Sequence, residues 1–188
     1  KNRYSSGFDP SIHFEKLGVI NQTTQLATDT QAISDYLKNI VAIKYGKENL
    51  GTHFADTRDT LCYATNDNQS AVIELLNTAA DLAIVMGGKN SSNSSHLVEL
   101  CEQKLPTYFI DDANKIIDEN QIIKTNWNDK SEEIIQNYLP AKNTVTILMT
   151  SGASCPDTVV ESVIRKIAGY YNVEEALEEV IQFWQSPN

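Results

Sequence analysis

The amino-acid sequence predicts an α/β protein in which parallel sheets are flanked by helices. The main observation is a unit of strand, Ser/Thr-rich loop and helix that recurs along the chain, with strands expected at 17–21, 82–85 and 144–150. Ligands of parallel sheets bind beyond the carboxyl ends of the strands. We therefore expect the three polar loops to lie at one edge and to converge on a small anion. The chain has no G-x-x-x-x-G-K-[ST] or G-x-G-x-x-G sequence, so the usual nucleotide-binding loops are not indicated.

Composition narrows the classes of function. The 188 residues are 41% hydrophobic, enough for one good-sized domain or two small ones, and no apolar run approaches a membrane span. A formal net charge of −10 argues against a nucleic-acid surface, which needs a basic stripe. The first residues are polar and show no apolar signal-peptide region. These features are compatible with a soluble cytoplasmic enzyme and argue against binding to nucleic acid or membrane.

The first quarter of the chain is expected to hold one strand and one helix. Residues 1–16 have no clear period and read as a loop. A buried strand at 17–21 is followed by a helix that Thr28 or Asp29 caps. The helix should end at Gly46, and these apolar residues form its buried stripe: Ile33, Leu37, Ile40 and Val41.

The next segment places a cysteine in front of a helix. Residues 50–60 are a connector in which His53 and Phe54 are expected to be packed. Cys62 then precedes a helix predicted over 70–80. Because a thiolate is favoured near a helix N-terminus, Cys62 suits a ligand or a nucleophile, and a small packed residue is the alternative.

The stretch from Met86 to His96 is the centre of the predicted site. It follows the apolar strand 82–85 and precedes residues 97–101, whose apolar side chains have helical spacing. The first amides of a helix have no intrahelical partner and the helix dipole favours negative charge there. Ser and Asn side chains add neutral donors that suit a phosphate. The alternative is that they only cap the helix.

The remaining elements follow from local pattern. We expect a strand at 106–110 and a charged, irregular segment over 113–137 that Trp127 anchors. A short helix is predicted at 132–139, and 144–150 is the most strand-like run. A further helix begins at Pro156, bearing Asp157 in its first turn and these apolar residues: Val160, Val163, Ile164 and Ile167. The last helix, 174–184, is amphipathic and is expected to pack.

Three cysteines, Cys62, Cys101 and Cys155, are too few and too scattered for a disulfide framework. No C-x-x-C pair is present, which disfavours a self-contained zinc or thioredoxin site. Cys101 is expected in the core. Cys155 precedes Pro156 and is interpreted as structural.

Four motifs in order carry a family resemblance: Asn21-Gln22-Thr23-Thr24, Cys62-Tyr63-Ala64-Thr65 with Gln69, Lys89-Asn90-Ser91-Ser92-Asn93-Ser94, and Thr150-Ser151-Gly152-Ala153-Ser154-x-Pro156. Nearly the whole chain resembles 4-hydroxy-3-methylbut-2-enyl diphosphate reductase, the IspH or LytB family. Phe8-Asp9-Pro10 and Lys44-Tyr45-Gly46 look most like its plant and cyanobacterial branch.

The resemblance implies an iron–sulfur reductase with a three-domain, trefoil-like arrangement. The family converts its allylic diphosphate into isopentenyl and dimethylallyl diphosphate, which ends the methylerythritol phosphate route to isoprenoids. It uses a 4Fe–4S cluster held by three cysteines, and an electron donor such as ferredoxin or flavodoxin. The implied location is the bacterial cytoplasm, or the plastid stroma in a plant-type host.

The resemblance also assigns roles to individual residues. Cys62 matches the last cluster ligand. Thr23 matches the threonine near the substrate hydroxyl, supported by Gln22 and Thr24. The diphosphate-binding groups are matched by Ser91, Ser92, Asn93 and Ser154.

The departures from the family pattern predict a partial protein. Asn68 stands where the family often has Arg, and nothing here matches two further cluster cysteines, two diphosphate-binding histidines or the proton-relay glutamate. His13, His53 and His96 lie in other contexts. We therefore expect a carboxyl-terminal half, with 1–58 the remainder of the second α/β domain and 59–188 the third. One thiolate cannot hold a cubane cluster, so the chain alone should be inactive and should hold none.

Two other functions fit part of these observations. A cluster-free module that binds phosphate or sugar phosphate would keep the polar loops without the redox chemistry. A periplasmic-type binding domain is a third possibility, against which the absence of an export signal at the start of the sequence counts.

Overall fold

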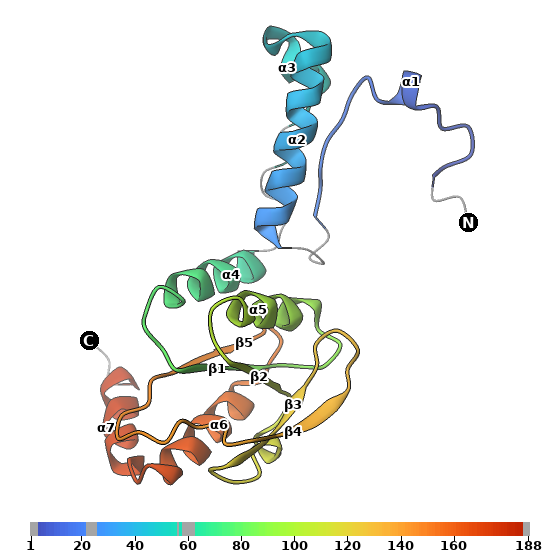
Figure 1. Cartoon of the computed structure of the whole chain (residues 1–188). Helices are drawn as coiled ribbons and strands as arrows, with labels where there is room; N and C mark the ends of the chain where they lie inside the picture. The colour runs from blue at the N-terminus through green and yellow to red at the C-terminus, as the bar shows by residue number, and fades with distance from the viewer. Residues whose placement is uncertain (1–3, 22–25, 56, 58–62, 186–188) are drawn as a thin grey trace. The chain divides into compact units, whose positions relative to one another are not determined.

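The structure is a computed structural model that describes residues 4–21, 26–55, 57 and 63–185. The chain divides into two compact units, residues 1–63 and 64–188. Figure 1 shows that the first is built of helices and connecting chain, whereas the second holds the sheets. Each unit is described by itself.

The main element of the first unit is α2, Ala27–Tyr45. It ends as predicted at Gly46, whose φ of 89° is favourable for glycine alone. The predicted N-cap is wrong: Leu26 occupies that position without a side-chain hydrogen bond, and Thr28 and Asp29 lie inside the first turn.

The buried stripe predicted for α2 is only partly present. Val41 is buried, whereas Ile33 and Ile40 keep 43% and 42% of their surface exposed. Two short helices complete the regular structure described in this unit, together with the 3-10 turn η1, Lys47–Asn49. They are α1, Pro10–His13, and α3, Leu50–His53.

The strand predicted at 17–21 does not form. Leu17 makes an isolated parallel bridge with Phe54: its amide donates to the His53 carbonyl at 2.9 Å and its carbonyl accepts from Ala55 at 2.7 Å. The expected packing after α2 is confirmed, because Phe54 is buried and the His53 ring stacks on Tyr45 at 3.8 Å. The segment 1–16, expected to be a loop, contains α1.

A three-stranded parallel sheet forms the core of the second unit. The central strand is β1, Leu82–Met86, with β2, Thr107–Ile110, on one side and β5, Ile147–Ser151, on the other. Every residue of β1 is buried, as expected for a parallel strand that is covered on both faces. The predicted fold class, a parallel sheet flanked by helices, is therefore confirmed for this unit.

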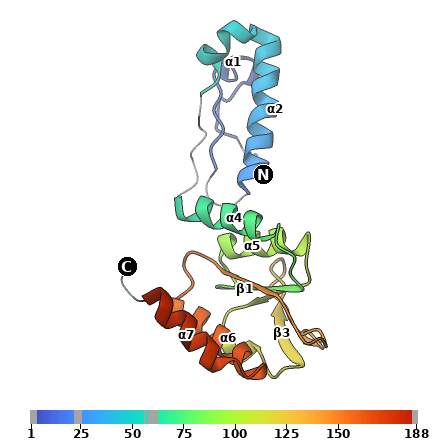
Figure 2. The same cartoon turned by 90° about the vertical axis from the view of Figure 1, so that its left-hand side faces the viewer.

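Helices cover both faces of this sheet, as the two views agree (Figures 1 and 2). On one face lie α4, Tyr63–Leu75, and α5, Ser92–Glu102. On the other lie α6, Asp157–Tyr170, and α7, Glu174–Gln185. Leu82, Ile84 and Met86 alternate along β1 toward the second face, where Val163 and Ile167 of α6 join them in the main core cluster.

Two element predictions are corrected in this unit. The helix expected at 70–80 is α4, which begins seven residues earlier, at Tyr63, and ends at Leu75. The helix expected at 132–139 is wrong, because β4, Glu132–Gln136, pairs antiparallel with β3, Gln121–Thr125. A 3-10 turn, η2, Ala113–Lys115, precedes this hairpin. Trp127 does anchor the segment, since its indole N–H donates to Glu102 of α5 at 3.0 Å.

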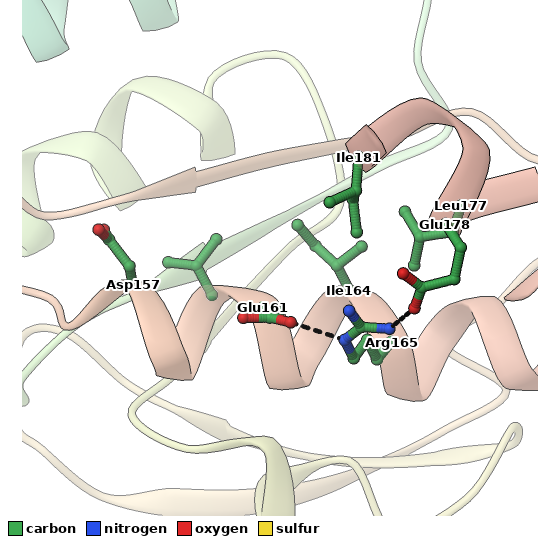
Figure 3. Close-up of a pocket in the computed structure, with 8 residues that line it drawn as sticks. Asp157, Glu161, Ile164, Arg165, Leu177, Glu178 and Ile181 are labelled. Carbon is green, nitrogen blue, oxygen red and sulfur yellow. Dashed lines mark hydrogen bonds and ion pairs between the residues drawn. The ribbon is translucent and has the colours of Figure 1, made fainter. Parts of the chain in front are cut away.

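The C-terminal helices were predicted closely. The helix was predicted to begin at Pro156. In the structure Pro156 is the N-cap of α6, so the helix begins one residue later, with Asp157 in its first turn. A groove of about 520 Å³ separates α6 from α7, where Arg165 bonds to both Glu161 and Glu178 (Figure 3). No helix in the described ranges is both long enough and apolar enough to span a membrane.

Candidate functional site

Two polar loops meet at the carboxyl edge of the parallel sheet. The first follows β1 and leads into α5, and the second follows β5 and leads into α6. Met86 and Ser151, the last residues of β1 and β5, are paired in register. The contact continues beyond the strands, because the Gly152 amide donates to the Met86 carbonyl at 2.9 Å. The expected convergence is thus found for two of the three predicted loops.

The first loop ends in a capped helix N-terminus. Ser91 is the N-cap of α5, and its hydroxyl accepts from the Ser94 amide at 3.3 Å. Its carbonyl accepts from the Ser95 amide at 3.0 Å. The cap leaves the amides of Ser92 and Asn93 in the first turn, where a helix supplies no intrahelical acceptor. The predicted capping role of the loop is therefore real, and two donors remain for a ligand.

The second loop presents its serine at a tight turn. The Cys155 amide donates to the Gly152 carbonyl at 2.8 Å, so Ala153 and Ser154 occupy the tip. Ser154 and Ser92 are both exposed, whereas Ser91 and Asn93 are half-buried. The structure thus brings all four of the predicted diphosphate-binding residues of this unit to neighbouring strand ends.

Asn93 has an unusual side chain for this position. Its Oδ1 and Nδ2 atoms are both inaccessible to solvent and, within the described ranges, neither has a hydrogen-bond partner. A buried carboxamide without partners is costly, typically about 1–3 kcal/mol for an unsatisfied group. A polar ligand at the start of α5 would relieve that cost.

The positive charge of the first loop is directed to acidic side chains. Lys89 forms an ion pair with Glu132 of β4 and lies 3.8 Å from Asp111, which follows β2. The Glu132 hydrogen bond and the two carboxylates raise the pKa of Lys89. The donors left for an anion in the two loops are therefore neutral hydroxyl, carboxamide and backbone groups.

Four predicted site residues fall outside the described residues. They are Cys62, expected to be a cluster ligand, and the three residues expected at the substrate hydroxyl, Gln22, Thr23 and Thr24. The position of Cys62 in front of a helix therefore stays a prediction, and the description of α4 begins at Tyr63.

Comparison with known proteins assigns the family. A family model described as LytB protein matches residues 4–168. The chain belongs to the LytB family. The resemblance inferred from the four motifs is thereby confirmed.

Two curated relatives in the LytB family carry the name 4-hydroxy-3-methylbut-2-enyl diphosphate reductase. The one from Rippkaea orientalis is 42% identical over 168 residues, which are 89% of this chain and 41% of the relative. The one from Synechocystis is 38% identical over 178 residues, covering 94% of this chain and 46% of the relative. The chain thus spans less than half the length of these relatives, both of the cyanobacterial type that the sequence predicted.

A solved structure shares the fold of this LytB chain. It is the E-1-hydroxy-2-methyl-but-2-enyl-4-diphosphate reductase from Plasmodium falciparum, at a TM-score of 0.53 and 21% identity. The match covers 83% of this chain and 41% of that chain.

The LytB family implies a 4Fe–4S cluster, and the described cysteines do not fit one. Cys101 is fully buried in α5, and burial raises the pKa of its thiol to about 11. Burial likewise raises the pKa of Cys155, and the nearby Asp157 adds to the shift. Both shifts disfavour the thiolate form, which is the form that a cluster ligand takes. Among the residues that the structure describes, no three His, Cys, Asp or Glu side chains gather as a metal site.

Sequence reasoning missed several residues that shape this site. Asn68, noted only as a departure from the LytB pattern, donates from its side-chain amide to the Ser151 carbonyl at 3.2 Å. It thereby ties α4 to the end of β5. Gly87 and Gly152, each directly after a strand, were not singled out. Their position next to two Ser-rich loops was the available signal.

Proposed function

We propose that this chain acts as the carboxyl-terminal part of a 4-hydroxy-3-methylbut-2-enyl diphosphate reductase. Its membership of the LytB family and the reductase activity for which its cyanobacterial relatives are named support the proposal. Because the chain matches less than half of those relatives, the complete reaction needs residues that the 188 do not supply. In that setting ferredoxin or flavodoxin would deliver the electrons.

The substrate diphosphate is proposed to bind at the paired loops. Ser91, Ser92 and Asn93 would hold it from the start of α5, and Ser154 from the turn after β5. The observation that carries this assignment is the unpartnered, buried carboxamide of Asn93 beside a helix N-terminus, within the described residues. Free first-turn amides and the helix dipole favour an anion at the same place.

Cys62 is proposed to supply one thiolate to the cluster of the complete protein. The match of Cys62-Tyr63-Ala64-Thr65 to the motif of the last cluster ligand in the LytB family supports this role. Cys101 and Cys155 are not proposed as cluster ligands, because burial raises the pKa of both thiols. The 188-residue chain alone is therefore expected to form no cluster. Thr23, with Gln22 and Thr24, is proposed to lie at the substrate hydroxyl.

A chimeric enzyme tests this proposal. The matched 168 residues of the Rippkaea orientalis reductase are replaced by the corresponding residues of this chain. We expect the chimera, reconstituted anaerobically with iron and sulfide, to show cluster absorbance and to reduce the allylic diphosphate. Cys62→Ser in the chimera should abolish both, because one of three thiolates is lost.

Matched variants separate this role from misfolding. Cys101→Ser and Cys155→Ser in the same chimera should retain the cluster absorbance, because neither thiol is proposed as a ligand. A folded chimera in which Cys62→Ser leaves the cluster intact would contradict the assignment of Cys62. Cluster absorbance formed by the isolated 188-residue chain would contradict the partial-enzyme proposal.

A second candidate is a cluster-free module that binds phosphate groups. It is favoured by one observation: the four proposed diphosphate ligands all lie in the second unit and none requires Cys62. Under this alternative the isolated chain binds pyrophosphate equally well with Cys62→Ser, and the chimera reduces no substrate.

A further inference from the structure

The hydroxyl of Ser94 fills a notch between two glycines that belong to different loops. A Cβ atom built on Gly87 would lie 2.1 Å from Ser94 Oγ, and one built on Gly152 would lie 2.2 Å from it. No real Cβ approaches another atom so closely. Ser94 itself is fully buried in the first turn of α5. The three residues therefore pack as one side chain wedged between two bare backbones.

Space, not backbone conformation, is the reason for glycine at both positions. Neither Gly87 nor Gly152 has a positive φ; among the described glycines only Gly7 and Gly46 do. Each instead follows a strand end, and the two backbones approach so closely that the Gly87 Cβ would lie 3.8 Å from the Gly152 amide nitrogen. Alanine at Gly152 would collide with Ser94 Oγ, whereas alanine at Gly87 would collide with both Oγ and Cβ of Ser94.

The Ser94 hydroxyl does not replace Asn93 as a ligand. It has no hydrogen-bond partner in the part of the chain that the structure describes, and it differs from the Asn93 carboxamide in that it lies against the backbones of the two glycines. A buried hydroxyl left without a partner is normally selected against. We attribute the presence of serine here to its size, which matches the space between the two glycines.

We propose that Ser94 is a positioning residue that fixes the spacing of the two loops and so lets them share one diphosphate. This inference rests on the proposed diphosphate site. Ser91, Ser92 and Asn93 lie on the helix that carries the wedge, whereas Ser154 lies on the loop that begins at Gly152. The wedge touches the first residue of each loop, so it sets how far the two groups of donors stand apart.

Size-exchange variants of the 188-residue chain test the wedge. Gly152→Ala should lower the melting temperature by about 5 °C, because the new methyl collides with Ser94 Oγ. Adding Ser94→Ala should restore it to the value of Ser94→Ala alone, since the next nearest atom is Ser94 Cβ at an acceptable 3.4 Å. Gly87→Ala should not be rescued in this way, because Ser94 Cβ would remain 2.8 Å from its methyl.

Binding of inorganic pyrophosphate, followed by calorimetry, tests the positioning role. Gly152→Ala should weaken it at least about tenfold, and the double variant should regain most of the loss. Val163→Ala, a cavity in the opposite face of the sheet, serves as the control: it lowers the melting temperature comparably but should leave the affinity unchanged.

Two results would overturn the inference. The steric wedge would be contradicted if Ser94→Ala rescued Gly87→Ala and Gly152→Ala equally. It would also be contradicted if Ser94→Ala rescued neither variant. Pyrophosphate affinity that falls as much in Val163→Ala as in Gly152→Ala would contradict the positioning role. If the unaltered chain binds no pyrophosphate although the rescue pattern holds, the proposed diphosphate site fails, and the role of Ser94 in binding fails with it.

Discussion

At the scale of single residues, one carboxylate connects the hairpin to the first polar loop. Glu132, the first residue of β4, accepts from Lys115 at 2.7 Å and also pairs with Lys89 of the loop. These two lysines, Lys115 first, lower the pKa of Glu132. The ion pair between Lys89 and Glu132 therefore keeps the Lys89 side chain directed toward the hairpin.

The shifted pKa of Glu132 predicts a pH-dependent stability. A carboxyl group whose pKa is lowered on folding stabilises the protein above its unfolded pKa, whose reference value is 4.5. This contribution is lost as the pH falls through the lower folded-state value. Glu132→Gln should therefore lower the melting temperature at neutral pH, with a difference from the unaltered chain that shrinks toward zero in acid below that value.

Thermal unfolding measured across this acid range checks the prediction. Glu133→Gln, which changes the neighbouring exposed residue, is the matched control and should show a smaller pH-dependent difference. A Glu132→Gln effect that is the same at neutral and acid pH would show that charge on Glu132 is not responsible.

Residue-scale chemistry was only partly visible in the sequence. The polar loop at Ser91–Asn93 could be predicted because capping and anion binding use the same local residue types. The partners of Asn68 and Lys89 could not, since Ser151 and Glu132 lie 83 and 43 positions away. No local pattern indicates such pairs.

At the scale of elements, the hairpin β3–β4 is the clearest failure of local pattern. Glu132–Gln136 reads as a helix because Glu and Gln are good helix formers. The segment becomes a strand because β3 supplies an edge, with Ile122 opposite Ile135 and Ile123 opposite Ile134. Tertiary pairing outweighs intrinsic propensity here.

The opposite error occurred near the start of the chain. Leu17–Asn21 has the composition of a buried strand, yet in the described residues its β-pairing is limited to one bridge, from Leu17 to Phe54. A strand forms only where a neighbouring backbone continues the pairing over several residues. Sequence composition reports the tendency and not the presence of that neighbour.

Two isoleucines of the hairpin predict how it contributes to stability. Ile122 is fully buried in the main core cluster, whereas Ile134 is 57% exposed. Ile122→Ala should cost about 2–5 kcal/mol of unfolding free energy through lost burial and a cavity. Ile134→Ala should change the free energy of unfolding by no more than about 0.5 kcal/mol.

Urea denaturation of both variants measures this contrast. Comparable midpoints for the two would mean that the hairpin is not integrated into the core. In that case Glu132 could not hold Lys89 through a rigid element.

At the scale of the whole molecule, the order of motifs was more informative than the elements. Four short motifs with defined residue types indicated the LytB family, and the family match over residues 4–168 confirms it. The alternation of strands and helices predicted the parallel sheet and two of its loops. It could not predict the glycine wedge, which depends on how closely two strand ends approach.

The length of the chain relative to its family determines what it is expected to do alone. It spans 41% of the Rippkaea relative, and one candidate cluster cysteine falls within it. The second unit nevertheless holds the four proposed diphosphate ligands. Diphosphate binding is therefore the part of the reaction that the chain alone can be tested for.

Amide chemical-shift mapping of the 188-residue chain with pyrophosphate tests the central claim most directly. The account predicts that the largest shifts fall in two segments, residues 91–95 at the start of α5 and 152–155 after β5, and that both titrate with one affinity. Shifts confined to one segment, separate affinities for the two, or shifts centred elsewhere on the chain would contradict a shared diphosphate site.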